Sequence, residues 1–364
     1  MSVPERRIGV IVINFGEPNP PVPDQVQAFL ERIFLQNAGL EPSEEALKRT
    51  RQLARDRTPG LVKEYQAIGG SPLNRQADQQ AQLLSEELAR RGWDVRTYSA
   101  FQYTEPFIAE KVDEARDDGV EVVVALPLYP ICGQSTTVAA LQDVRLRLDE
   151  LGWVPEYVGV SGWHHHPGYV EMRTEHIRTY VEANGLDLTA SDTLLYFSVH
   201  GTPLKYLDEG NRYDRYVDEQ CRSIAQRLGA DRYGVGFQNH TNRRIQWTQP
   251  ENEDRIRGAE EERLVVVPIS FMHEQSETLA ELDHELRDFV EELGKEFYRV
   301  PVPHDEPAFI AFLGDLVAQL VSDPEGGAVR LASCRCAPLA GVRCTNGHRE
   351  LPQSPYAAPV EEST

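Results

Sequence analysis

The sequence is poor in cysteine and has no long apolar segment. Its 364 residues include five cysteines, too few and too unevenly spaced for the disulfide framework of a secreted protein. No apolar run reaches the roughly 18 residues that a membrane-spanning helix needs. The opening residues, MSVPERRIGVIVINFG, lack the long apolar stretch of a signal peptide. We therefore expect a protein that is made and kept in the cytoplasm.

Positive charge is scarce as well. Lys and Arg together number 37 against 58 Asp and Glu, which gives a formal net charge of −21. An acidic surface repels phosphate backbones, so nucleic acid is not an expected partner. The same surface suits a cationic substrate, and it would equally suit life at high salt. Charge alone does not choose between these two interpretations.

A phosphate-binding glycine motif is also missing. The loop Phe15–Pro23 follows the first apolar run and holds four prolines, which have no N–H group, together with the acidic Glu17. The pair Gly69-Gly70 has neither the GxGxxG spacing nor the lysine of a P-loop. The sequence therefore argues against a nucleotide-binding enzyme.

Short apolar runs alternate with amphipathic stretches along nearly the whole chain. Apolar runs without alternation are typical of strands buried on both faces, with helices above and below the sheet. This order predicts βαβ units and a doubly wound α/β fold with parallel sheets. The expected strands are Ile8–Asn14, Val95–Phe101, Glu121–Leu126, Tyr157–Val160, Thr193–Ser198, Tyr233–Phe237 and Leu264–Ile269. The expected helices are Gln76–Arg91, Glu105–Asp117, Ser135–Leu151, Arg212–Leu228 and Thr278–Leu293.

Two halves of similar βα order follow each other along the chain. We predict an N-terminal α/β domain over residues 1–165, a C-terminal α/β domain over 166–325 and a cysteine-containing extension with a frayed end over 326–364. The triplet His164–His166 at the boundary is interpreted as a surface loop, because adjacent side chains on an extended chain point opposite ways. Ligands of such sheets bind outside the carboxyl ends of the strands, so residues there carry the functional predictions.

His200 is the sharpest single candidate for a chemical role. It directly follows the apolar run Thr193–Ser198, at a predicted strand end, and Gly201 and Pro203 make the loop behind it tight. The ordinary pKa of imidazole lies near neutrality, so this side chain could accept a proton. A loop histidine that only caps backbone carbonyls is the alternative.

A row of carboxylates follows the last expected strand. Glu277, Glu281 and Glu285 recur every four residues, so they share one face of the predicted helix. Such a row could pass a hard or borderline cation or relay protons. The alternative is a solvated acidic face. Only Glu277, in the first turn beside the strand end, is well placed for a cleft.

Three cysteines cluster in the extension, namely Cys334, Cys336 and Cys344. In a reducing compartment such clusters indicate a metal or iron–sulfur centre, which needs a fourth ligand. Cys132 follows a predicted strand and is a candidate for that ligand. Cys221 lies inside a predicted helix, where it is interpreted as a small core residue. Zinc and [2Fe–2S] both fit four thiolates, and spacing does not separate them.

Aromatic residues occupy or adjoin the predicted post-strand loops. Phe15, Tyr103, Tyr129 and Trp247 could wall a flat apolar ligand, although aromatics in such places also serve plain packing.

The motifs themselves resemble the ferrochelatase family over about Ile8 to Leu320. The most specific stretches are SVHGTP at Ser198–Pro203 and PISFMHEQSETLAELDHE at Pro268–Glu285. Four weaker stretches support them. These are VIVINFGEP at Val10–Pro18, IGGSPL at Ile68–Leu73, FQYTEP at Phe101–Pro106 and LPLYP at Leu126–Pro130.

The resemblance implies an enzyme that inserts Fe²⁺ into a porphyrin, protoporphyrin IX or coproporphyrin III, in haem biosynthesis. It implies two similar Rossmann-like domains of the chelatase type with the macrocycle between them. His200 and Glu277 match the family's active-site histidine and glutamate, and the resemblance implies that both are catalytic and meet the substrate Fe²⁺. Glu281 and Glu285 match the acidic row that leads away from the site, a possible relay.

Further roles follow from the same resemblance. Phe15, Tyr103 and Trp247 match positions in porphyrin-binding segments. Cationic partners for the porphyrin propionates are expected near the mouth of the site, with Arg243 and Arg244 as candidates. The resemblance leaves the oligomeric state and the iron donor open, and it allows peripheral contact with a membrane or with another enzyme of haem synthesis.

Some family members bind [2Fe–2S] through one internal and three C-terminal cysteines. Cys132, Cys334, Cys336 and Cys344 resemble that set, although Cys221 stays open as the internal ligand. One departure stands out beside the catalytic motif. Gln275 holds a place, two residues before the glutamate, where many relatives have histidine.

Two rival functions remain at this stage. One is a haem or porphyrin carrier that binds without inserting metal. The pairing of His200 with Glu277 argues against it, because proton removal serves insertion and not storage. The other is a chelatase for a different metal, such as cobalt.

Overall fold

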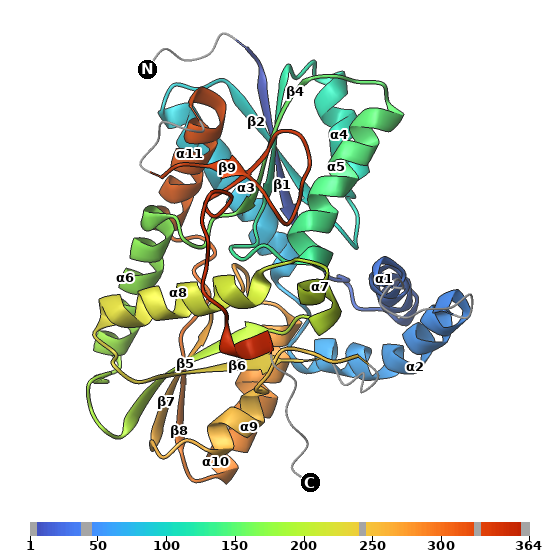
Figure 1. Ribbon diagram of the computed structural model, residues 1–364. Coiled ribbons are helices and arrows are strands. Elements are labelled where there is room, and N and C mark those ends of the chain that lie inside the picture. The colour runs from blue at the N-terminus through green and yellow to red at the C-terminus, as the bar shows by residue number, and fades with distance from the viewer. Residues whose placement is uncertain (1–5, 38–45, 240–244, 324–328, 358–364) are drawn as a thin grey trace.

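The computed structural model describes residues 6–37, 46–239, 245–323 and 329–357. The protein consists of two lobes, each built around one sheet, with one lobe above the other (Figure 1). The first sheet has the strand order β2-β1-β3-β4-β10-β9, and the second has the order β6-β5-β7-β8.

The first sheet is parallel through its first five strands. Its long strands are β1 (Ile8–Asn14), β2 (Val95–Phe101), β3 (Val122–Pro127) and β4 (Glu156–Gly162). Two short strands of the extension complete it: β10 (Val342–Cys344) runs parallel to β4, and β9 (Ala332–Ser333) runs antiparallel to β10.

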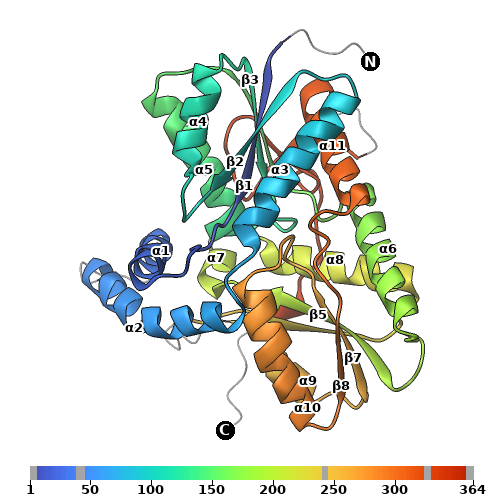
Figure 2. The same ribbon diagram turned by 180° about the vertical axis from the view of Figure 1, so that it is seen from behind.

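Helices cover both faces of this sheet. One side carries α3 (Leu73–Arg90) and α11 (Pro307–Ser322), and the other carries α4 (Ile108–Asp117) and α5 (Ala139–Glu150) (Figure 2). Successive residues of β1 alternate between the two layers, since Val10 and Val12 pack with α3 and α11 whereas Ile11 and Ile13 pack with α4 and α5. This explains why β1 is apolar throughout.

The second sheet is parallel in all of its strands. These are β5 (Thr193–His200), β6 (Tyr233–Gln238), β7 (Arg263–Pro268) and β8 (Glu296–Arg299). On one face lie α6 (Pro167–Ala183) and α8 (Tyr213–Leu228). On the other lie α9 (Asn252–Arg257), η3 (Glu277–Leu286) and α10 (Arg287–Glu292).

The two halves share an unusual feature after their third strand. A π-helix follows β3 as η2 (Gln134–Val138), and another follows β7 as η3. The periodicity of the sequence predicts helices in both places but not their wider winding, in which each N–H bonds five residues back. Such segments are rare and concentrate at functional sites.

The remaining elements lie at the edges. The pair α1 (Pro23–Gln36) and α2 (Ala46–Ala67) projects to one side of the junction between the lobes (Figure 1). The short helices α7 (Leu204–Asp208) and η4 (Pro355–Ala357) flank the second sheet.

The predicted α/β class is confirmed. All seven expected strands are present as β1–β7 with small shifts at their ends. Helix α11 falls inside the predicted C-terminal domain, yet it packs against α3 and against β3 and β4 of the first sheet. The boundaries at residues 165 and 325 stay a prediction.

The interpretation of His164–His166 as a surface loop is wrong. His164 is fully buried beneath α8 and the extension, and His166 is 7% exposed beside Phe312 of α11. The ring of His164 stacks on Tyr216 of α8 at 4.9 Å. The burial of this turn could not be predicted locally, because the residues that cover it lie far away in the sequence.

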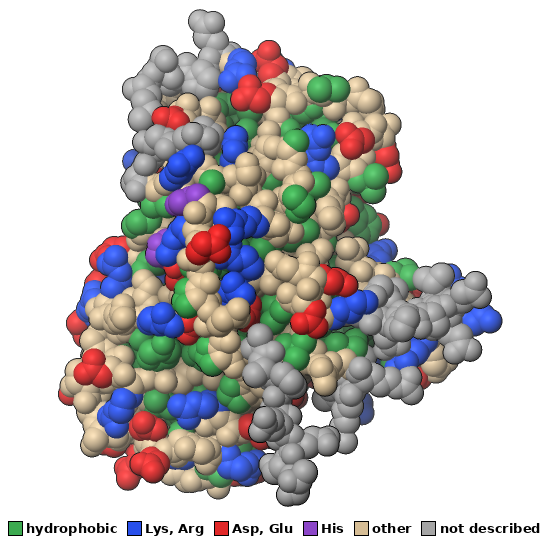
Figure 3. All heavy atoms as spheres, in the orientation of Figure 1, with side chains coloured by type: hydrophobic (Ala, Val, Ile, Leu, Met, Phe, Trp, Pro, Cys, Tyr) green, Lys and Arg blue, Asp and Glu red, His purple; other side chains and the backbone are tan. Residues whose placement is uncertain are grey.

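No helix within the described ranges is long and apolar enough to cross a membrane. The surface is mixed despite the net charge. Lys and Arg side chains gather over the middle of the face shown in Figure 3, where the extension crosses the junction between the lobes.

Candidate active site

A pocket lies where the carboxyl ends of both sheets meet. The first lobe contributes residues that follow β1, β2 and β3, and the second contributes residues that follow β5 and β7. This is the edge where α/β folds bind ligands. Seven of the residues predicted for the site line the pocket, namely Phe15, Tyr103, Tyr129, His200, Trp247, Glu277 and Glu281.

His200 occupies the last position of β5. Its backbone N–H donates to Ser270 Oγ at 3.0 Å, and its carbonyl accepts from Tyr213 Oη at 2.9 Å. Its Nδ1 lies 2.7 Å from the carbonyl oxygen of Gly201. Because a carbonyl can only accept, Nδ1 carries the proton, and the lone pair of the neutral ring sits on Nε2.

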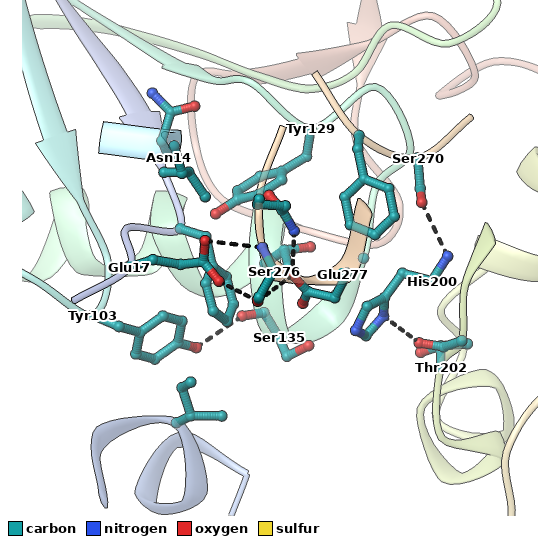
Figure 4. A pocket seen from close by; sticks show the side chains of 18 of the residues that line it. Asn14, Glu17, Tyr103, Tyr129, Ser135, His200, Thr202, Ser270, Ser276 and Glu277 are labelled. Carbon is teal, nitrogen blue, oxygen red and sulfur yellow. Dashed lines mark hydrogen bonds between the residues drawn. The ribbon is translucent and has the colours of Figure 1, made fainter. Parts of the chain in front are cut away.

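The environment of His200 keeps its imidazole neutral. Burial lowers the pKa of His200, and the hydrogen bond to Gly201 opposes that shift only in part. A neutral imidazole with a lone pair on Nε2 is the form that accepts a proton at neutral pH. In Figure 4 its ring and the carboxyl group of Glu277 both point into the pocket.

Glu277 begins the π-helix η3, directly after the loop that follows β7. Its Oε2 accepts from Gln275 Nε2 at 2.6 Å, and the hydroxyl oxygen of Ser276 lies 3.2 Å from the same atom. Burial raises the pKa of Glu277. Gln275 thus holds the carboxyl group of Glu277 directly.

The acidic row divides along the helix. Glu281 also lines the pocket, and burial together with the charge of Glu277 raises the pKa of Glu281 to about 8. Glu285 is exposed and is absent from the pocket lining. The structure therefore brings Glu277 and Glu281 together in the pocket and leaves Glu285 outside it.

Gln238, at the end of β6, is a polar contact that the sequence analysis missed. Its Nε2 donates to the backbone carbonyl of Glu277 and to Glu281 Oε2, each at 3.0 Å. Its Oε1 accepts from Ser198 Oγ at 3.2 Å. The position of Gln238 at a strand end could have indicated a site residue, but its side chain is an uncharged amide, which gave no reason to single it out.

Glu17 is the second residue that the sequence analysis missed as a site residue. It lies in the loop after β1, lines the pocket and is only 2% exposed. Burial and the nearby charge of Glu277 raise the pKa of Glu17 to about 7, although hydrogen bonds from Ser276, Ser71 and Tyr65 oppose this. The sequence showed an acidic residue after a strand, yet nothing that indicated its burial.

Aromatic rings form one wall of the pocket. Phe15 lies 4.5 Å from Tyr103 and 6.0 Å from Phe29 between ring centroids. Trp247 pairs with Pro203, the last residue of the SVHGTP motif. Tyr129 lines the pocket as well and donates to Gln102 Oε1. The predicted propionate partners Arg243 and Arg244 lie outside the described residues.

Four of the five cysteines converge beside the pocket loop that follows β3. Cys344 of β10 pairs with Gly162 of β4, and a Cβ atom placed on Gly162 would lie 3.4 Å from the Cβ of Cys132 and 3.8 Å from that of Cys344. Hydrogen bonds from Cys132, Cys336 and Cys344 lower the pKa of the Cys334 thiol. Cys221 faces Asp218 and Tyr213 instead.

Two thiols of this cluster have polar contacts with the surrounding chain. Cys334 Sγ accepts from the N–H of Ala337 at 3.2 Å, and Cys336 Sγ lies 3.2 Å from Tyr216 Oη. In the part of the chain that the structure describes, no group of three or more His, Cys, Asp or Glu side chains forms a ready metal-ion site. The cluster is thus a set of close, mostly buried thiols.

The two-lobed fold is the one seen in solved chelatases. The backbone is similar to that of SirB from Bacillus subtilis with Fe³⁺, with a TM-score of 0.51 at 10% identity over 88% of this chain and 98% of that one. It is also similar to the sirohydrochlorin chelatase SirB from Bacillus subtilis subspecies spizizenii in complex with cobalt, with a TM-score of 0.50 at 10% identity. These similarities show the fold alone.

Sequence comparison gives the family. The family model described as Ferrochelatase matches residues 7–321. The ferrochelatase of Synechococcus sp. (strain RCC307) is 34% identical over 330 residues, covering 88% of this chain and 84% of that protein. The ferrochelatase of Nostoc punctiforme is 32% identical over 329 residues, covering 87% and 83%. The chain belongs to the ferrochelatase family.

Proposed function

We propose that this protein inserts Fe²⁺ into a porphyrin, with His200 as proton acceptor and Glu277 as the residue that handles metal and protons. One observation carries the proposal. A neutral imidazole and a buried carboxyl group from the second lobe share a pocket with Phe15 and Tyr103 of the first lobe and Trp247 of the second. A flat macrocycle between the lobes would meet all of these groups.

The reaction requires both kinds of group. A free-base porphyrin gives up two pyrrole N–H protons as one Fe²⁺ binds its four nitrogens, so porphyrin plus Fe²⁺ yields metalloporphyrin plus two protons. His200 Nε2 is placed to accept the first proton. Glu277 and Glu281 can hold the incoming cation or carry the second proton away, and Glu285 continues the row toward solvent.

The aromatic wall supplies binding energy remote from the reacting nitrogens. Contacts from Phe15, Tyr103 and Trp247 with the macrocycle can hold it in a bent geometry that tilts pyrrole lone pairs toward the metal. Such contacts raise the rate only if they favour the distorted ring over the flat one.

We further propose that Cys132, Cys334, Cys336 and Cys344 hold a [2Fe–2S] cluster. The donor set fits, because four mostly buried thiols from two distant segments of the chain converge. When bound, the cluster supplies a covalent cross-link between the extension and the first lobe. It takes no part in the proton and metal transfer proposed for the pocket.

Metal and sulfide analysis tests the cluster proposal. The purified protein should be brown and contain 2 Fe and 2 sulfides per chain, the composition of one [2Fe–2S] centre. Cys334→Ser should lose the colour, and Cys221→Ser should keep it, because Cys221 faces Asp218 and Tyr213. A colourless protein with stoichiometric zinc, or bleaching by Cys221→Ser, would refute the assignment.

A turnover assay tests the proposed activity against its rivals. Anaerobic protein with excess Fe²⁺ and either protoporphyrin IX or coproporphyrin III should release many metalloporphyrins per chain. Binding of one porphyrin without turnover would identify a carrier. Faster insertion of Co²⁺ than of Fe²⁺ would identify a chelatase for another metal.

A further inference from the structure

Glu17 connects three segments of the two lobes through one buried carboxylate. It lies three residues beyond the end of β1, and its backbone is fixed by Asn74 of α3, which accepts from its N–H at 2.9 Å and donates to its carbonyl at 3.0 Å. Its Oε1 accepts from Tyr65 Oη at 2.9 Å, and its Oε2 accepts from Ser71 Oγ. These contacts all lie within the first half of the chain.

The remaining contacts of Glu17 reach the second half. Ser276 Oγ donates to Glu17 Oε1, and the N–H of Ser276 lies 3.3 Å from Glu17 Oε2 (Figure 4). Ser276 immediately precedes Glu277, and its hydroxyl oxygen is 3.2 Å from Glu277 Oε2. The carboxylate thus holds the residue at the start of η3 by both its backbone and its side chain.

The contact between Glu17 and Ser276 is buried next to Glu277. Ser276 is 8% exposed and Glu17 2% exposed, so neither side chain can exchange its partner for bulk water without opening the junction. A buried carboxylate that loses its hydrogen-bond donors costs free energy, so the positions of Glu17 and Ser276 relative to each other are tightly constrained.

We propose that Glu17 is a positioning residue for metal insertion: through Ser276 it fixes the orientation of Glu277 toward the pocket. The inference rests on the proposed function of Glu277. It goes beyond that function because it makes the first lobe a determinant of how the second lobe's carboxyl group is presented. Porphyrin binding, which depends on the aromatic wall, should not depend on Glu17.

The first test is Glu17→Gln with steady-state kinetics of Fe²⁺ insertion. The amide cannot accept from the Ser276 N–H and hydroxyl as the carboxylate does, so kcat should fall about tenfold to hundredfold, the loss expected for a misplaced catalytic group. The KM for porphyrin should stay within about threefold. Unchanged kcat, or a loss confined to KM, would overturn the proposal.

Glu87→Gln is the matched control. Glu87 is a buried glutamate on α3, 8% exposed, and it pairs with Arg91 and Arg90 away from the pocket. This variant should melt at a lower temperature and keep its kcat within about twofold. An equal loss of kcat in both variants would show that the effect comes from stability, and the proposal would then fail.

Ser276→Ala keeps the inference testable if Glu17→Gln does not fold. It leaves Glu17 its donors Tyr65 and Ser71 and removes only the hydroxyl that contacts both carboxyl groups. We expect the same fall in kcat at unchanged porphyrin affinity. An unaltered kcat in Ser276→Ala would contradict the proposed path.

A double-mutant cycle separates this inference from the proposed function. The cycle compares kcat of Glu17→Gln, Ser276→Ala and the variant that carries both changes. If Glu17 acts through Ser276, kcat of the double variant should be about as low as that of the slower single variant, whereas independent effects would multiply. Multiplying losses would overturn the inference alone. Full activity in Glu277→Gln would instead overturn the proposed function, whatever the cycle shows.

Discussion

At the scale of single residues, the acidic row of η3 divides into members with different environments. Glu277 and Glu281 line the pocket, whereas Glu285 is exposed. We expect Glu277→Gln to lower kcat about a hundredfold or more, Glu281→Gln about tenfold, and Glu285→Gln less than threefold. Initial rates of Fe²⁺ insertion measure this order, and an effect of Glu285→Gln equal to that of Glu277→Gln would contradict it.

Phe15 offers a test of the aromatic wall. Its ring packs on Tyr103 and Phe29 beside the pocket. Removal of the ring in Phe15→Ala should raise the KM for porphyrin roughly fivefold, since one ring-on-macrocycle contact contributes about 1 kcal/mol. Quenching of porphyrin fluorescence on binding measures the same loss directly. Unchanged affinity would place the macrocycle elsewhere.

The sequence predicts the proposed catalytic residues at strand ends better than it predicts the side chains that hydrogen-bond to their neighbourhood. His200 and Glu277 stand out because they directly follow apolar runs or sit in the first turn beyond one. Glu17 and Gln238 make their contacts across 259 and 43 positions of the chain, and no local pattern reports such partners. Their burial among residues that are distant in the sequence exists only once the fold is complete.

At the scale of elements, α8 connects the active site to the extension. Residues three apart on one face of this helix make successive contacts. Tyr213 donates to the carbonyl of His200, Tyr216 contacts Cys336, and Glu219 pairs with Arg349 at 2.5 Å and with His164 at 3.1 Å. The helix therefore anchors the extension at the turn between the lobes.

Glu219 gives this anchor a pH dependence. Burial opposes ionisation, but the hydrogen bonds to His164 and Arg349 outweigh it and lower the pKa of Glu219 to about 2. A folded-state pKa below the unfolded value stabilises the protein above about pH 4.5, and this contribution is lost as pH falls toward 2. Its side chain is 16% exposed, so screening reduces the effect to about 2 kcal/mol.

The corresponding variant is Glu219→Gln. Denaturant unfolding should show it to be less stable than the parent at pH 7, with the difference shrinking between about pH 4.5 and 2. A difference that stays constant down to pH 2 would show that the ion pair is not its source.

The type of each element was predictable and its winding was not. The apolar stripe of Thr278–Leu293 predicts a helix, which is present, but the segment Glu277–Leu286 winds as a π-helix. Single-sequence periodicity does not distinguish these windings over so few turns. The strands β9 and β10 have two and three residues, too short for any pattern to show.

At the scale of the whole molecule, the extension joins the first sheet, and its thiols meet a loop of that lobe. A bound cluster would cross-link Cys132 with three residues about 200 positions later in the chain. Removing iron with a chelator should therefore lower the melting temperature by at least about 5 °C, because binding energy at such a site is also folding energy. Cys334→Ser should melt at that lower temperature with or without chelator. A chelator effect that persists in Cys334→Ser would locate the metal elsewhere.

The central claim is that His200 and Glu277 act together on one porphyrin in the interlobe pocket. The most direct measurement is the insertion rate of His200→Ala and of Glu277→Gln, alongside porphyrin binding by each variant. The account predicts that both lose at least about a hundredfold in kcat while porphyrin affinity changes only a few-fold. Either variant turning over at the parent rate, with porphyrin bound as tightly, would contradict it.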